Sequence, residues 1–143
     1  MNVIQILRSK GSAAIETITS DITLSDAAAR LAARRIGALV VTGRDGSIAG
    51  ILSERDIVRR IGEEGARALS LKVSDVMTSK VETCSPSDTA ISVLERMTSG
   101  RFRHMPVMEG GKMTGILSIG DVVKARIDEV EAENQAMAGM LSG

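Results

Sequence analysis

Apolar residues gather in short runs along the first half of the chain, and three of these runs are typical of strands. Residues 15–19, 38–42 and 47–52 are short, rich in aliphatic residues, and bounded by glycine, serine or aspartate. Between the second and third runs, Asp45-Gly46 supplies the backbone conformation of a tight turn. We therefore predict one strand followed later by a hairpin.

Helical periodicity fills the chain between and after these strands. Ser25-Asp26 opens an alanine-rich stretch in which Ala27 and Leu31 share one face, which predicts a helix before the hairpin. Ser53 ends the hairpin and begins a second helix whose apolar positions continue to Ile61. The first half is thus predicted to run strand, helix, hairpin, helix.

The second half repeats this order after a connecting segment with a short predicted helix near residues 71–77. Pro106 falls inside one of the predicted strands, and a proline belongs at the edge or the start of a strand. The two hairpins are therefore not expected to be equivalent. The predicted elements are strands at residues 81–84, 104–108 and 113–117 and helices from Ser87-Asp88 and Ser118.

One motif ends both hairpins and shows that a supersecondary unit is used twice. Residues 50–56 (GILSERD) recur 65 residues later as residues 115–121 (GILSIGD). We predict an α/β protein of two β-α-β-β-α repeats, at residues 3–65 and 66–127, followed by a helical tail at residues 128–143. Because half of a 143-residue chain is too small to hold a core alone, the two sheets are expected to pack face to face.

Composition disfavours several classes of protein. The 18 basic and 18 acidic residues cancel, so a broad positive surface for nucleic acid is not expected, and Phe102 is the only aromatic residue available for base stacking. The single Cys84 cannot form an intramolecular disulfide, and no apolar stretch reaches the roughly 18 residues of a membrane span. No secretory leader is recognisable, so we expect a soluble protein of the reducing cytoplasm that does not associate with a membrane.

The Ser-x-x-Asp part of the motif has two explanations. It is a capping box, which needs no ligand. However, the preceding glycine leaves the backbone bare just ahead of a helix N-terminus, where free N–H groups attract a phosphate. A carboxylate in the first helical turn can also accept hydrogen bonds from both hydroxyls of a ribose, as in dinucleotide-binding folds. The second explanation is therefore a nucleotide site.

The doubled order of elements resembles a tandem pair of CBS domains, also called a Bateman module. Both halves carry the full signature, GALVVTGRDGSIAGILSERDIV and RHMPVMEGGKMTGILSIGDVV, and the resemblance extends from about Val3 to Ile127. It implies a disc-like homodimer whose interdomain clefts bind adenosine-containing ligands such as AMP, ATP, NAD or S-adenosylmethionine. In many relatives the pair regulates an enzyme or channel to which it is fused.

The resemblance also implies roles for residues of the first motif. Asp56 is expected to bind the ribose, Ser53 to lie near the phosphate, and Ile51 to line the adenine face. In this family each site is completed by the segment that leads into the first strand of the other repeat. For the Asp56 site these residues are Thr78, Val81 and Thr83.

The second motif receives the same roles by resemblance, through Asp121, Ser118 and Ile116. Arg103 and His104 match positions where relatives place a basic pair on the phosphates. The first repeat has Gly37 and Ala38 at these positions, so two equal phosphate sites are not expected. The residues expected to complete the Asp121 site are Ser9, Ile15 and Thr17.

Three further features have plainer alternatives. His104 is the only histidine. The alternative to phosphate binding is that it has a structural role at the start of a strand. Cys84 lies in an apolar run without an adjacent base, which favours a buried thiol over a nucleophile. The tail has apolar or amide residues at alternating spacings of three and four, which predicts either packing onto the module or a dimer seam. These are Ile127, Val130, Asn134, Met137 and Leu141.

Our leading hypothesis is a non-catalytic cytoplasmic sensor of adenine nucleotides, with no cofactor or metal of its own and a regulated partner protein. The alternative is a ligand-independent homodimeric scaffold in which Ser-x-x-Asp only caps helices. Nucleic-acid binding through the strip at residues 101–104 is a third and weaker option.

Overall fold

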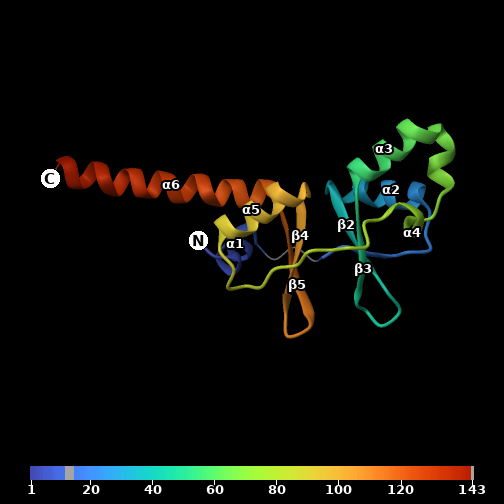
Figure 1. Cartoon of the computed structure of the whole chain (residues 1–143), viewed down its shortest axis with the longest axis horizontal. Helices are drawn as coiled ribbons and strands as arrows, with labels where there is room; N and C mark the ends of the chain where they lie inside the picture. Colours follow the sequence, from blue (N-terminus) through green and yellow to red (C-terminus); the bar gives the residue numbers. More distant parts are fainter. Residues whose placement is uncertain (12–14, 143) are drawn as a thin grey trace. The chain divides into compact units, whose positions relative to one another are not determined.

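The computed structural model describes residues 1–11 and 15–142, which form two compact α/β units (Figure 1). The first unit is Ile15–Val81, and the second combines Met1–Ala14 with Glu82–Gly143. The α/β class and the two-repeat organisation are confirmed. The expectation that half of the chain cannot hold a core was wrong, because each unit has its own cluster of buried apolar side chains. The face-to-face packing of the sheets stays a prediction. The division falls after Val81 and not after residue 65, because the connecting segment folds with the first repeat.

The first unit is built on a three-stranded sheet in the order β1-β2-β3. β1 (Thr17–Thr19) pairs in parallel with β2 (Ala38–Thr42), which pairs antiparallel with β3 (Ile48–Ser53). These strands confirm the predicted strand and hairpin. The helices are α2 (Leu24–Arg34), α3 (Glu54–Glu64), the 3-10 helix η1 (Gly65–Ser70) and α4 (Val73–Val76).

The core of the first unit consists of aliphatic side chains from the sheet and from α2, α3 and α4. Leu24, Leu39, Leu52 and Val73 are fully buried within it. The predicted helix start at Ser25-Asp26 differs slightly, since α2 begins one residue earlier. Its N-cap is Thr23, whose hydroxyl accepts a hydrogen bond from the backbone N–H of Asp26 at 3.1 Å.

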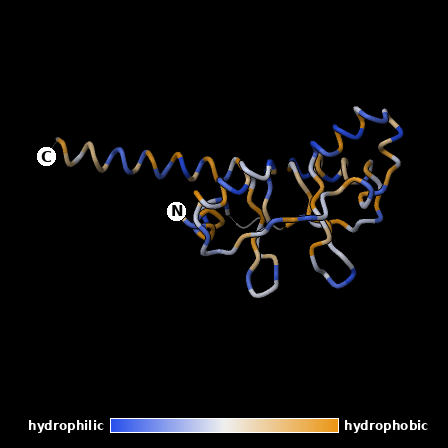
Figure 2. Tube along the Cα trace, viewed as in Figure 1, coloured by the Kyte–Doolittle hydropathy of each residue, from blue (hydrophilic) through white to orange (hydrophobic). Residues whose placement is uncertain are grey.

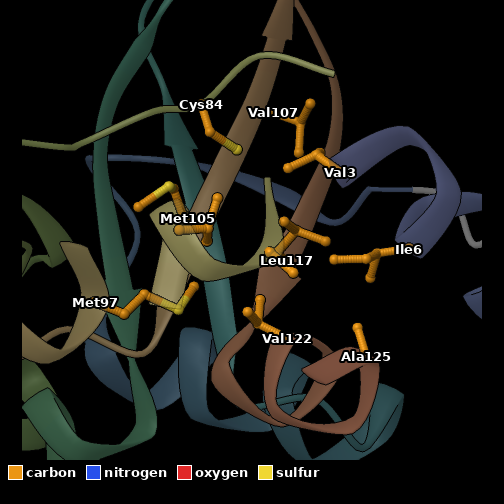
Figure 3. Packing of buried hydrophobic residues seen from close by; sticks show 11 residues of the cluster. Val3, Ile6, Cys84, Met97, Met105, Val107, Leu117, Val122 and Ala125 are labelled. Atoms are coloured by element: carbon orange, nitrogen blue, oxygen red, sulfur yellow. The ribbon is translucent and has the colours of Figure 1, made fainter. Parts of the chain in front are cut away.

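The second unit contains a two-stranded antiparallel sheet. β4 (His104–Glu109) pairs with β5 (Lys112–Ser118), and α1 (Val3–Lys10), α5 (Ala90–Gly100) and α6 (Ile119–Ser142) contribute its helices. Figure 3 shows its core, in which Val3 and Ile6 of α1 lie with Leu117 of β5 and Val122 of α6. The N-terminal helix is thus an integral part of the second repeat.

The strand predicted at residues 81–84 does not form, so this prediction was wrong. The reason is that Pro86 and Pro106 lack the N–H groups that the strand pairing would need. Cys84 alone bridges Val107 in parallel, through a bond from its N–H to the carbonyl of Pro106 at 3.0 Å. Extending this ladder in either direction needs an N–H donor at Pro106 or at Pro86, and proline has none. In the first unit Val40 stands at the position of Pro106 and donates to the carbonyl of Glu16 at 3.4 Å, so β1 forms.

The helix predicted from Ser87-Asp88 begins later than expected. α5 starts at Ala90, and its N-cap is Thr89, whose hydroxyl accepts from the N–H of Ser92. The Asp88 carboxylate instead accepts from the backbone N–H of Ser85 at 2.9 Å. Ser87 and Asp88 therefore belong to the turn before the helix.

The helix predicted from Ser118 is α6, which is much longer than its counterpart α3 and continues through the predicted tail. Its buried side chains end at Ala125, and beyond that residue Ile127 is 52% and Leu141 87% exposed. Figure 2 shows hydrophobic and hydrophilic residues alternating along this exposed part. None of the helices in the described residues is long and apolar enough to span a membrane.

Candidate functional site

The first motif forms a capping box at the junction of β3 and α3. The backbone N–H of Ser53 donates to Asp56 Oδ2 at 2.9 Å, and the N–H of Asp56 donates to Ser53 Oγ at 3.3 Å. The Ser53 hydroxyl also donates to Asp56 Oδ2 at 3.0 Å. Both side chains are half-buried. The arrangement holds a carboxylate at a helix N-terminus, which satisfies the capping explanation and is compatible with the nucleotide explanation.

The second motif builds the same arrangement where β5 meets α6. The N–H of Ser118 donates to Asp121 Oδ2 at 2.9 Å, and the N–H of Asp121 donates to Ser118 Oγ at 3.2 Å. Because these bonds join residues three apart, each motif specifies its own local geometry. The two units differ in what crosses the strand just before the motif.

In the first unit, the chain after α4 crosses β3 directly over Gly50. Thr78 forms an antiparallel bridge with Ile51, with N–H to carbonyl bonds of 2.9 Å in both directions. A Cβ atom on Gly50 would lie 2.7 Å from the Thr78 carbonyl oxygen and 2.8 Å from Met77 Sδ. The structure thus places Thr78 against Ile51, two residues before the N-cap Ser53, and requires glycine at position 50.

In the second unit, α1 takes the place of that crossing segment. A Cβ atom on Gly115 would lie 2.8 Å from a terminal methyl group of Leu7. Lys10, at the end of α1, donates through Nζ to the Ile116 carbonyl at 3.0 Å and to Asp121 Oδ2 at 2.8 Å. The site at Asp121 therefore contains a cation that forms an ion pair with the expected ribose-binding carboxylate.

Lys10 was missed by sequence reasoning, which selected its neighbour Ser9. The Ser9 hydroxyl donates to the carbonyl of Ile6 at 2.9 Å within α1. The available signal was the Ser-Lys pair at residues 9–10, which recurs at residues 79–80 ahead of the second repeat. Spacing alone could not show which member of the pair faces the site.

Two opposing influences act on the pKa of Asp121. Partial burial raises this pKa, but hydrogen bonds from Lys10 and Ser118 and the positive charge of Lys10 outweigh burial, so the pKa lies below its usual value. The carboxylate is therefore charged at neutral pH and holds the ammonium group of Lys10.

The other predicted site residues are distributed between the two units. His104 is half-buried at the start of β4 and lies opposite Ser118 in the antiparallel pairing, while Arg103 precedes it with an exposed side chain. This pairing brings the predicted basic pair to the edge that carries the second motif. Val81 folds in the same unit as Asp56, whereas Ile15 and Thr17 fold in the unit opposite to Asp121 and Thr83 in the unit opposite to Asp56. The site roles of these four residues stay predictions.

Cys84 is buried, as the sequence predicted, and its environment affects its protonation. Burial raises the pKa of Cys84 to about 11, with the charge of Asp88 adding to this effect and that of Arg96 opposing it, so the group is a thiol at neutral pH. Within residues 1–11 and 15–142, no group of three or more histidine, cysteine, aspartate or glutamate side chains is placed to hold a metal ion.

Comparison with known proteins places this geometry in a family. A mitochondrial CBS domain-containing protein of Arabidopsis thaliana, CBSX3, is 37% identical over 96% of this chain and 70% of its own length. The crystal structure of a CBS-domain containing protein of Agrobacterium tumefaciens, ATU1752, matches with a TM-score of 0.84 at 45% identity and covers 88% of this chain and 99% of its own.

A CBS domain protein of Pyrobaculum aerophilum, solved in complex with AMP, is 26% identical, with a TM-score of 0.74 over 85% of this chain and 89% of its own. The family model of the CBS domain matches twice, at residues 11–63 and 73–128, once for each motif. The doubled capping box and the two repeats that carry it are thus those of a CBS domain pair, and the chain belongs to the CBS domain family.

Proposed function

We propose that the protein is a non-catalytic regulatory module that binds adenine nucleotides at its two Ser-x-x-Asp sites. The observation that carries this proposal is that both motifs hold a half-buried aspartate in the first turn of a helix. Such a carboxylate can accept hydrogen bonds from ribose hydroxyls while the helix N-terminus attracts phosphate. The AMP complex of the Pyrobaculum relative supports the choice of an adenine ligand.

Thermal unfolding tests this function directly. Excess AMP, ATP or NAD is expected to raise the melting temperature, because a ligand of the native state stabilises it by RT ln(1+[L]/Kd), about 2.7 kcal/mol at 100 times Kd. Guanosine and cytidine monophosphates are the matched controls, since they carry the same ribose and phosphate. If no adenine compound shifts the melting temperature, the scaffold alternative replaces this proposal.

We further propose that the protein acts in the cytoplasm on a regulated partner and forms a homodimer that pairs through α6. The exposed part of α6 has a heptad pattern in which Asn134 occupies the same core position as Ile127 and Leu141. In a parallel pair, Arg126 of one helix faces Glu131 of the other, which gives opposite charges across the seam. A buried asparagine at such a position favours a single register.

Removal of residues 127–143 is expected to convert this dimer into a monomer, because the deleted segment carries most of the exposed apolar face. The truncated subunit should stay folded, since the buried side chains of α6 end at Ala125. Light scattering at micromolar concentration measures the mass against the 15.1 kDa of one full chain.

The point variant Ile127→Glu should have the same effect, and Ala132→Glu on the opposite face is its control. A truncated protein that stays dimeric while its melting temperature falls would show that the tail stabilises its own unit and does not form the seam.

A further inference from the structure

Lys10 occupies the hydrogen-bonding groups that a nucleoside would use in the second unit. Its ammonium group contacts both the Asp121 carboxylate and the Ile116 carbonyl, and the side chains of Lys10 and Asp121 are 32% and 23% exposed. The same oxygen of Asp121 also accepts from the backbone of Ser118. A ribose that uses both carboxylate oxygens through its two hydroxyls therefore competes with the ammonium group for Oδ2.

The backbone that carries Lys10 is firmly anchored. α1 begins with a capping box at Asn2, and the N–H of Val3 donates to the carbonyl of Asp88 at 2.8 Å. Val3 and Ile6 are buried in the core of the second unit. The packed helix thus delivers Lys10 to Asp121, and the flexible four-carbon side chain allows the ammonium group to change partners.

The first unit lacks this cation. Among the described residues, no lysine or arginine lies within ion-pair distance of Asp56, and the carbonyl of Ile51 is bonded to the backbone of Thr78. The two sites therefore share the motif and the capping box but differ by one mobile positive charge beside the carboxylate.

We propose that Lys10 makes the Asp121 site selective for phosphorylated adenine nucleotides over uncharged nucleosides, by moving from the carboxylate to the phosphate when the ligand binds. An uncharged nucleoside takes the carboxylate and leaves the ammonium group without an anionic partner, whereas a nucleotide brings its own anion. Arg103, next to the residue that pairs with Ser118, adds positive charge at the same edge. The proposal rests on the proposed function and specifies the ligand class of one of its two sites.

The test is calorimetric titration of AMP and adenosine into proteins in which Asp56→Ala leaves only the Asp121 site. AMP is expected to bind more tightly than adenosine, and adding Lys10→Met should reduce this preference about tenfold, since a charge-assisted hydrogen bond to phosphate is lost. Adenosine should at the same time bind more tightly, because the competing ammonium group is gone. High salt should weaken the AMP preference of the Lys10 protein and change that of the Lys10→Met protein much less.

Lys112→Met is the matched control, because it removes the same charge from an exposed position at the far end of β5. Circular dichroism checks that each variant is folded. If AMP binds but Lys10→Met leaves the ratio of AMP affinity to adenosine affinity unchanged, Lys10 does not discriminate between the two ligands. This proposal is then overturned, while the proposed function stands. If neither compound binds to the protein that retains both aspartates, the proposed function is overturned together with this proposal.

Discussion

Gly50→Ala is expected to destabilise the protein by about 1–3 kcal/mol, the usual effect of forcing an extra carbon into a packed site. The added Cβ would lie 2.7 Å from the backbone carbonyl oxygen of Thr78. That oxygen cannot move freely, because Thr78 is bonded to Ile51 through both of its backbone groups at 2.9 Å. The substitution should therefore break or displace the bridge between β3 and the segment that crosses it.

The equivalent variant Gly115→Ala is the matched control and should cost well under half as much. Its added Cβ would approach only the terminal methyl groups of Leu7, at 2.8 and 3.1 Å, and a leucine side chain can change its rotamer. Urea unfolding followed by far-ultraviolet circular dichroism measures both free energies, since the chain has no tryptophan. Equal losses at the two glycines would contradict the difference that we assign to backbone and side-chain neighbours.

Asp56→Ala is expected to reduce adenine-nucleotide affinity at its own site by more than tenfold. A hydrogen bond to a charged group contributes roughly 1.5–3 kcal/mol, and a ribose that binds through two hydroxyls would lose two such bonds. The same change removes half of the capping box and should lower stability by about 1 kcal/mol. Calorimetric titration in an Asp121→Ala background isolates the Asp56 site.

Asp56→Asn separates ligand binding from capping. The amide oxygen of asparagine can still accept from the N–H and hydroxyl of Ser53, so the cap is largely retained while the charge is lost. Asparagine should therefore weaken nucleotide binding with little loss of stability. Unchanged affinity in both variants, with lower stability in the alanine variant, would show that Asp56 only caps α3.

The capping boxes and the two hairpins were predictable from the sequence because their contacts are local. Ser53 and Asp56 are three residues apart, as are Ser118 and Asp121, so each motif determines its own hydrogen bonds. Strand pairing across a short turn is local in the same sense, and the 65-residue repetition of the motif revealed the two-repeat organisation. The predicted helix starts were displaced by one to three residues, since Thr23 and Thr89 compete with nearby serine and aspartate residues for the N-cap position.

Tertiary structure alone decided the features that join distant segments. Lys10 and Asp121 are 111 residues apart, and no spacing rule brings a lysine at the end of one helix to the first turn of another. The lost strand at residues 81–84 depends on the register of Cys84 against Val107, which sets Pro86 and Pro106 where donors are needed. Such contacts follow from the packing of α1 and the β4–β5 sheet around the core of the second unit. The sequence therefore determined two matching motifs, and the tertiary structure gave them different surroundings.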